Sequence, residues 1–264
     1  MTDPRDVLSR PGSPPDAVIR YGSAPEHVAD LRLPLRRDRP HPLVVLLHGG
    51  FWRSVYDRTH TRPMADGLVA AGYAVATPEF ARTSAGGGWP STFDDVALAV
   101  ARVPELVSEL IDITRIVLVG HSSGGQLALW CASSNLPHAY AGVVALAPVA
   151  DLSAAFRLDL DGGAVRALLG GSPEEVPDRY ESGDPCRLPP PTGRVVVLHG
   201  EEDGQVPVEC STRYAAHAGA ALRVLPGVEH FGLIDPTSTA WAAVLEAVRS
   251  VQDGGCARGL ASSP

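Results

Sequence analysis

Short, uninterrupted apolar runs recur along this 264-residue chain, and helical stretches separate them. Strands that are apolar on both faces are typical of parallel sheets covered by helices on both sides. Two further short strands, at 17–21 and 28–33, bring the expected total to about eight. The pattern predicts an α/β fold with a mostly parallel, twisted sheet. The six runs are 43–47, 73–77, 115–119, 142–147, 194–198 and 221–225, and the main helix candidates are 59–71, 93–103, 123–134, 211–219 and 237–251.

The chain length, at about 150 residues per domain, is compatible with one α/β domain, which we place at 17–251. The polar, Pro-rich residues 1–16 are expected to form a loose arm, and 252–264 a flexible tail. Residues 151–190 hold no strand-like run, which predicts a small insertion after the sixth strand, interpreted as a lid. Pro104 is expected to end or kink the helix that starts near Phe93.

Composition excludes several kinds of chemistry. All 22 basic residues are Arg, so a Schiff-base lysine, a Ser–Lys dyad and a P-loop lysine are excluded. The net charge of −8 argues against a nucleic-acid surface. No apolar run approaches the length of a membrane span, and the N-terminus does not fit a signal peptide, so we expect a cytoplasmic protein. Neither a metal motif nor a cofactor motif is present, and Cys131, Cys186, Cys210 and Cys256 are expected to be reduced.

The strongest chemical signal is the segment GHSSG at 120–124, which fits G-x-S-x-G. It lies between the strand 115–119 and the helix 123–134, as a nucleophile elbow requires. We therefore expect Ser122 to be a nucleophile and the backbone N–H of Ser123 to face the site. The alternative is a decayed elbow in a non-enzymatic relative.

A serine nucleophile needs a base. His230 is favoured because it lies in a loop between the last strand candidate and the final helix. His121 and His199 are the competing candidates. The side chain of His121, next to the nucleophile in the elbow, is expected to point away from the site, and a packed role is expected for His199. Five further histidines are expected at the surface or in loops; they are His27, His41, His60, His138 and His217.

The base in turn needs an orienting acid, and three carboxylates follow the strand 194–198. We favour Asp203, because Gly204 lets the loop turn directly after it and a short side chain holds a fixed position. Glu201 and Glu202 are expected to be solvated.

Backbone donors for an oxyanion are expected after the strand 43–47, where Gly49 and Gly50 let N–H groups turn inward. The candidates are Gly50, Phe51 and Ser123, and an ordinary tight turn is the alternative. Candidate substrate contacts are Trp52, Glu79, Trp89 and Phe231. For Trp52 a core position is the alternative, and for Glu79 an ion pair with Arg82.

Four segments resemble the α/β-hydrolase superfamily: HGGFW at 48–52, GHSSGG at 120–125, HGEEDGQVP at 199–207 and EHFGLID at 229–235. The similarity spans about 17–251 and is closest to the branch of kynurenine formamidase (arylformamidase) and small esterases. The order Ser, Asp, His along the chain is that of α/β-hydrolases. The resemblance implies that Ser122 is the nucleophile, His230 the base and then the acid, and Asp203 the orienting group, with no cofactor.

The function that the resemblance implies is hydrolysis of a small formamide or ester through an acyl-enzyme, with N-formylkynurenine as the leading substrate. The alternatives are a carboxylesterase for short acyl esters, a peptidase, and a non-catalytic binding module on the same fold. The expected partner is a small-molecule substrate, without nucleic acid or membrane, and a homodimer stays open.

Overall fold

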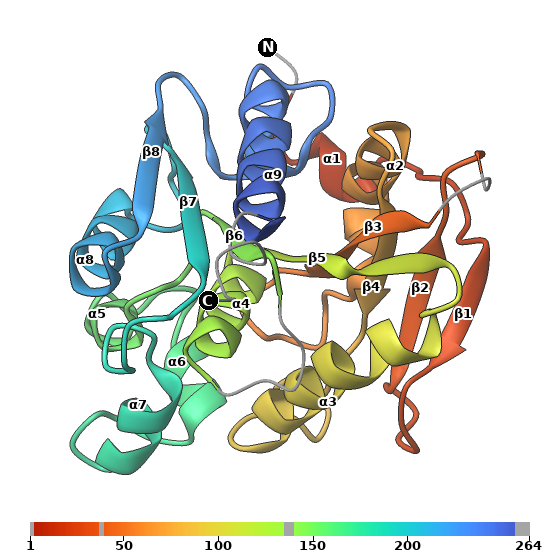
Figure 1. Ribbon diagram of the computed structural model, residues 1–264. Coiled ribbons are helices and arrows are strands. Elements are labelled where there is room, and N and C mark those ends of the chain that lie inside the picture. Colours follow the sequence, from red (N-terminus) through yellow and green to blue (C-terminus); the bar gives the residue numbers. More distant parts are fainter. Residues whose placement is uncertain (1–2, 37–39, 135–139, 257–264) are drawn as a thin grey trace, which may run out of the picture.

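The computed structural model describes residues 3–36, 40–134 and 140–256, and an eight-stranded sheet forms its centre (Figure 1). The strand order is β1-β2-β4-β3-β5-β6-β7-β8. The pairs β1–β2 and β2–β4 are antiparallel, and every pair from β4–β3 onward is parallel. The strands are β1 (Ala17–Arg20), β2 (Val28–Arg32), β3 (His41–Leu47), β4 (Ala74–Pro78), β5 (Ile111–His121), β6 (Gly142–Leu146), β7 (Arg194–Gly200) and β8 (Ala221–Leu225).

The continuous apolar runs become strands because both faces of the sheet are covered. In β3, Leu43, Val45 and Leu47 pack in one hydrophobic cluster. The alternate residues Val44 and Leu46 pack in a second cluster on the opposite face. The predicted α/β class, the mostly parallel sheet and its eight strands are therefore confirmed.

Helices cover the two faces in separate groups. Buried side chains of α3, α4 and α8 belong to the first cluster, and those of α1, α2 and α9 to the second. Figure 1 shows the second group together at the top of the molecule. The helices are α1 (Asp6–Ser9), α2 (Arg62–Ala70), α3 (Ser91–Leu106), α4 (Ser123–Ser133), α5 (Leu152–Arg157), α6 (Ala164–Leu169), α7 (Pro177–Gly183), α8 (Val208–Ala218) and α9 (Trp241–Cys256), with 3-10 turns η1 (Arg58–Thr61) and η2 (His230–Ile234).

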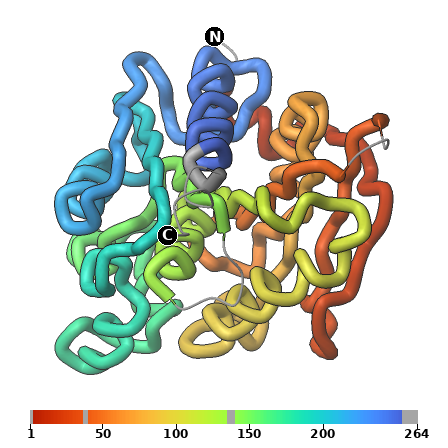
Figure 2. Tube along the Cα trace, in the orientation of Figure 1, coloured from red at the N-terminus to blue at the C-terminus, as the bar shows by residue number. Residues whose placement is uncertain are grey.

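The segment between β6 and β7 holds α5, α6 and α7, which confirms an insertion after the sixth strand. It occupies the lower left of the tube in Figure 2. The Asp184 carboxylate at the end of α7 accepts hydrogen bonds from the N–H groups of Leu152 and Ser153 at 3.1 and 3.0 Å. The insertion is therefore tied to its own beginning, and its role as a lid stays a prediction.

Helix α3 continues past Pro104 to Leu106, which differs from the expected break. A proline leaves the carbonyl four residues earlier without its helical donor. Here the Tyr140 hydroxyl donates to that carbonyl, Val100 O, at 2.6 Å. The side chain replaces the missing backbone donor, and the helix ends two residues after the proline.

The two ends of the described chain also differ from the expected loose segments. Residues 6–9 form α1, and Val7 is 1% exposed in the second cluster. Val7 and the neighbouring Leu8 both pack on this cluster, so two apolar side chains dock the short helix although its other residues are polar. At the other end, α9 continues to Cys256, so 252–256 are helical, whereas 1–2 and 257–264 lie outside the described residues. None of the described helices has the length and apolar character that a bilayer crossing requires.

Candidate active site

A sharp turn joins the end of β5 to the start of α4, and Ser122 stands at its apex. The backbone of Ser122 has φ 55° and ψ −120°, a conformation that L-residues rarely adopt. A Cβ on Gly120 would lie 2.2 Å from Gly124 O, and a Cβ on Gly124 would lie 2.3 Å from Leu47 O. Glycine is required at both positions for the strand, the turn and the helix to approach each other. The sequence motif therefore has the strand–turn–helix geometry of a nucleophile elbow.

Asp203, in the loop after β7, and His230, at the start of η2, form a buried pair. The distance between His230 Nδ1 and Asp203 Oδ2 is 2.7 Å, and the two side chains are 4% and 1% exposed. The other carboxylate oxygen of Asp203 accepts the N–H groups of Gln205 and Val206, each at 2.8 Å. These bonds hold the carboxylate in one orientation toward the imidazole.

His199 completes the surroundings of this carboxylate. Its Nε2 lies 3.2 Å from Asp203 Oδ2, and its Nδ1 lies 2.6 Å from Ser211 Oγ. Burial opposes ionisation of Asp203, but hydrogen bonds from His199, His230 and the Val206 N–H hold its pKa well below the usual range. The packed role predicted for His199 agrees with this position, and Asp203 is charged at neutral pH.

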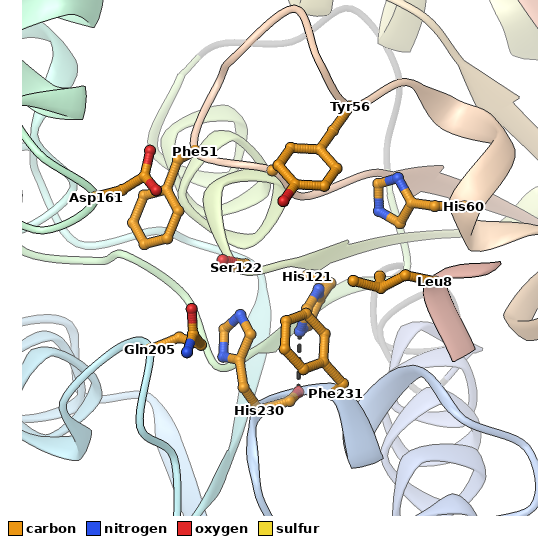
Figure 3. Close-up of a pocket in the computed structure, with 11 residues that line it drawn as sticks. Leu8, Phe51, Tyr56, His60, His121, Ser122, Asp161, Gln205, His230 and Phe231 are labelled. Atoms are coloured by element: carbon orange, nitrogen blue, oxygen red, sulfur yellow. Dashed lines mark hydrogen bonds between the residues drawn. The ribbon is translucent and has the colours of Figure 1, made fainter. Parts of the chain in front are cut away.

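A pocket of about 470 Å³, including its mouth, opens over Ser122 (Figure 3). In Figure 3, His230 and Gln205 lie on one side of Ser122, and Phe51 and Tyr56 lie across from them. Of the predicted site residues, Ser122, His230, Gly50, Phe51 and Phe231 line it. The remaining lining residues are Leu8, Tyr56, His60, His121, Asp161 and Gln205.

The loop after β3 has an unusual backbone. Gly50, Phe51 and Trp52 have φ values of 110°, 49° and 57°, so three successive residues are left-handed. Backbones of this kind can turn N–H groups into an anion-binding concavity. A Cβ on Gly49 would lie 3.1 Å from Ser122 Cβ, so the loop passes directly beside the elbow. The predicted oxyanion donors Gly50 and Phe51 therefore border the pocket, and Ser123 begins α4 beside Ser122.

The side chain of His48 contacts this loop and the residue after β4. Its Nε2 lies 2.9 Å from Glu79 Oε1, and its Nδ1 lies 2.8 Å from Gly49 O. Both ring nitrogens of His48 therefore lie within hydrogen-bond distance of an acceptor oxygen. The ring also stacks on Phe80 at 4.4 Å. His48 therefore connects the loop to the end of β4.

Glu79, predicted as a substrate contact, is 3% exposed and is not among the residues that line the pocket. It also accepts the N–H of Arg58 at 3.0 Å and lies 3.2 Å from Arg82 Nε. Burial opposes its ionisation, but the hydrogen bond and charge of His48 and the Arg58 N–H together lower its pKa. The substrate role is thus corrected to a buried ion pair, which includes the alternative pairing with Arg82.

Two of the predicted aromatic contacts also lie elsewhere. Trp52 is 2% exposed, and its Nε1 donates to Gln126 Oε1 at 3.1 Å in the core. Trp89 is half-buried and packs edge-to-face on Phe93 at 5.0 Å. Neither is among the lining residues, whereas Phe231 is. Of the two neighbours Phe51 and Trp52, Phe51 therefore lines the pocket and Trp52 is buried in the core.

His121 lines the pocket, although we expected its side chain to point away from the site. Its Nε2 donates to His230 O at 3.1 Å, and the two rings lie 4.5 Å apart. Its Nδ1 is buried without a hydrogen-bond partner in the described part of the chain. Burial and the nearby His230 lower the pKa of His121 well below its ordinary value. A neutral His121 therefore holds the backbone of His230.

His60 was expected at the surface but lies in the pocket wall. Its Nδ1 donates to Asp57 O at 2.6 Å, and burial lowers its pKa to about 4. The only available signal was its position shortly after the HGGFW segment. Leu8 and Asp161 had no such signal, because each lies far in sequence from every motif. Within the ranges 3–36, 40–134 and 140–256, no group of three or more His, Cys, Asp or Glu side chains is placed to hold a metal ion.

Three solved structures of similar architecture carry the name esterase. Esterase B from Lactobacillus rhamnosis is 18% identical, with a TM-score of 0.79, and the match covers 98% of this chain and 92% of that one. A truncated carbohydrate esterase from gut microbiota is 20% identical, with a TM-score of 0.73 and coverages of 90% and 95%. A thermophilic esterase from Thermogutta terrifontis is 19% identical, with a TM-score of 0.68 and coverages of 94% and 96%. At these identities the likeness shows the α/β-hydrolase fold.

A comparison with protein-family models identifies the family to which the chain belongs. A search of the curated proteins finds no match. A family model described as BD-FAE matches residues 29–217, which is more than half of the chain and includes Ser122 and Asp203. The matched range begins in β2 and ends in α8, so it contains the elbow, the loop after β3 and the insertion. The chain therefore belongs to the BD-FAE family and has the α/β-hydrolase fold.

Proposed function

We propose that this protein is a serine carboxylesterase that cleaves short acyl esters through an acyl-enzyme. The observation that carries the proposal is the strained Ser122 in the same pocket as a buried His230–Asp203 pair. Family membership and the esterase names of the solved structures support an ester as the substrate.

In the first half of the reaction, Ser122 Oγ attacks the ester carbonyl and His230 accepts its proton. Nδ1 of His230 donates its hydrogen to the Asp203 carboxylate, so the proton from Ser122 goes to Nε2. The N–H groups of Gly50, Phe51 and Ser123 stabilise the oxyanion, aided by the N-terminus of α4. His230 then protonates the departing alkoxide, and the acyl group stays on Ser122.

In the second half, His230 takes a proton from water, and the resulting hydroxide attacks the acyl-enzyme. Collapse of the second tetrahedral intermediate returns the proton to Ser122 and releases the carboxylic acid. The reaction needs one water per ester and no oxidant, reductant or metal. Asp203 stays ionised throughout and stabilises the imidazolium that forms on His230.

Hydrolysis of an aryl formamide such as N-formylkynurenine is a second candidate. The observation that favours it is the aromatic character of the pocket, where Phe51, Tyr56 and Phe231 surround Ser122. The same pocket would accept a small ester, and the chemistry of the first half is unchanged except that the leaving group is an amine.

The test compares kcat/KM for p-nitrophenyl butyrate and N-formyl-L-kynurenine in the wild type, Ser122→Ala and the exposed control Ser108→Ala. We expect Ser122→Ala to lose about 10^4-fold or more in kcat on every substrate, while Ser108→Ala keeps full activity. Higher kcat/KM on the ester supports a carboxylesterase, and higher kcat/KM on the formamide supports a formamidase. A Ser122→Ala variant that folds and retains more than about a tenth of the activity would overturn the mechanism.

A further inference from the structure

The N-terminal segment 3–10 reaches the active site, although the sequence marks it as a loose arm. Leu8, in α1, lines the pocket over Ser122. In Figure 3 it lies below His60 and beside Phe231, so its apolar side chain closes that side of the pocket. Leu8 and Phe231 are half-buried and pack against the second hydrophobic cluster.

Two contacts hold this segment in place. Val7 is 1% exposed and is a member of the second cluster. Arg10 forms two hydrogen bonds with the Asp235 carboxylate, at 2.6 and 2.9 Å. Asp235 directly follows η2, which begins with His230. The segment is thus fastened to the same short turn that carries the proposed catalytic base.

A second hollow, of about 380 Å³, is also bordered by His230 and Phe231. The N-terminal segment also borders this hollow, and the charged side chains there contrast with the apolar wall at Leu8. Its lining residues are Asp3, Pro4, Arg5, Gly204, Gln205, Glu229, His230 and Phe231. An apolar chain of a substrate is therefore expected on the Leu8 side, where Leu8 and Phe231 offer an apolar surface.

We propose that the segment 3–10 is the substrate-selecting wall of the active site, and that Leu8 limits the length of the apolar chain that the ester can carry. The proposal rests on the proposed esterase function. A leucine in the wall of a small pocket acts by occupying the space that further methylenes would need. Each methylene accommodated or excluded in an apolar pocket changes kcat/KM by about 10-fold or more.

The experiment measures kcat/KM over two ester series, one with acyl chains and one with alcohol chains of two to eight carbons. The variants are Leu8→Ala, Leu8→Phe and the conservative Leu8→Met, with Leu110→Ala as a matched control at a 44% exposed leucine remote in sequence from the site. For Leu8→Ala we expect the ratio of long-chain to short-chain kcat/KM to rise at least about 10-fold in one series. Leu8→Phe is expected to lower that ratio, and Leu8→Met and Leu110→Ala to leave it within about 2-fold.

The series that responds identifies whether the acyl or the alcohol chain lies against Leu8, and a response in either supports the proposal. Arg10→Gln, which unfastens the segment, is expected to shift the ratio in the same direction as Leu8→Ala. Thermal melting of each variant separates a changed pocket from an unfolded protein. Unchanged ratios in folded, active Leu8 variants would overturn this inference alone. An inactive wild type, or activity that survives in Ser122→Ala, would instead overturn the proposed function.

Discussion

Side chains outside the pocket hold the left-handed backbone of Phe51 and Trp52. Non-glycine residues in this region cost about 1–3 kcal/mol each, and they persist where the surroundings over-determine them. His48 supplies one support through Glu79 and Gly49 O. Thr83 supplies another, since its hydroxyl donates to Trp52 O at 3.0 Å. The proposed oxyanion donors thus depend on residues outside the pocket.

Replacing His48 by Gln tests this dependence. We expect kcat to fall about 10- to 100-fold with KM changed less, because loss of one oxyanion donor costs about 10²–10³-fold and loosening it costs less. His217→Gln, at an exposed histidine, is the control. Steady-state kinetics beside a thermal melt decides the outcome, and a lower melting temperature with unchanged kcat would reduce His48 to a packing role.

A second residue-scale expectation concerns Asp203. Asp203→Asn should lower kcat by about 10^4-fold, because an amide no longer favours the Nδ1–H tautomer of His230 or stabilises its positive form. Glu202→Gln, at the exposed neighbouring carboxylate, should keep activity within about 2-fold. Equal losses in the two variants would contradict the assignment of the acid.

At the scale of elements, the site is built where strands end and helices begin. The loop with Gly50 and Phe51 follows the carboxyl end of β3, Ser122 follows that of β5, and Asp203 follows that of β7. This is the general position of sites in parallel sheets. Two elbow glycines are required because backbone atoms of β3 and α4 occupy the space beside them. The conformation of this turn therefore depends on the close packing of β3 as well as on the 120–124 segment.

The substitution Gly124→Ala tests how much stability depends on the close approach of α4 to β3. Its Cβ would lie 2.3 Å from Leu47 O in the central strand β3, so the backbone must shift. We expect the free energy of unfolding to fall by about 2–3 kcal/mol. Gly193→Ala, where a Cβ meets nothing within 4 Å, should change it by less than about 0.5 kcal/mol. Urea denaturation of both variants gives the comparison, and similar losses would contradict the close approach.

The stability that the ion pair between Arg10 and Asp235 contributes should depend on pH. The hydrogen bond from Arg10 lowers the pKa of Asp235 to about 2. Because the pKa of Asp235 is lower in the folded protein than in the unfolded chain, its ionised form stabilises the fold. This stabilisation is complete above about pH 4 and is lost as pH falls toward 2. Asp235→Asn should cost roughly 1 kcal/mol at pH 6, with the difference shrinking as pH falls below 4. Melting curves of both proteins from pH 6 to pH 3 would show it, and a constant difference would contradict it.

Over the whole molecule, the sheet and the elbow could be predicted because their signals are local. Apolar runs identify strands, and GHSSG followed by a helix identifies the turn at Ser122. The pocket walls could not be predicted, because they depend on which of two neighbours turns inward and on contacts between distant segments. Phe51 and Trp52 illustrate the first case, and Leu8 beside Phe231 illustrates the second.

Buried neutral histidines should shape the acid stability of the protein. Burial lowers the pKa of His60 to about 4, so between about pH 6.5 and 4 the unfolded chain binds a proton that the folded protein does not. Stability due to this residue is therefore complete above about pH 6.5 and declines as pH falls toward 4, by roughly 2–3 kcal/mol. His60→Gln should flatten this part of the stability curve in urea titrations at several pH values. An identical slope in the variant would show that His60 is protonated in the fold.

The backbone of Ser122 carries a final consequence. A residue held at φ 55° and ψ −120° is strained for any L-amino acid but not for glycine. Exchanging this serine for glycine would remove the nucleophile and relax the turn at the same time, so the inactive protein should outlast the active one on heating. Serine at this position therefore lowers the stability of the fold, which is the cost expected if Ser122 has the proposed nucleophilic role.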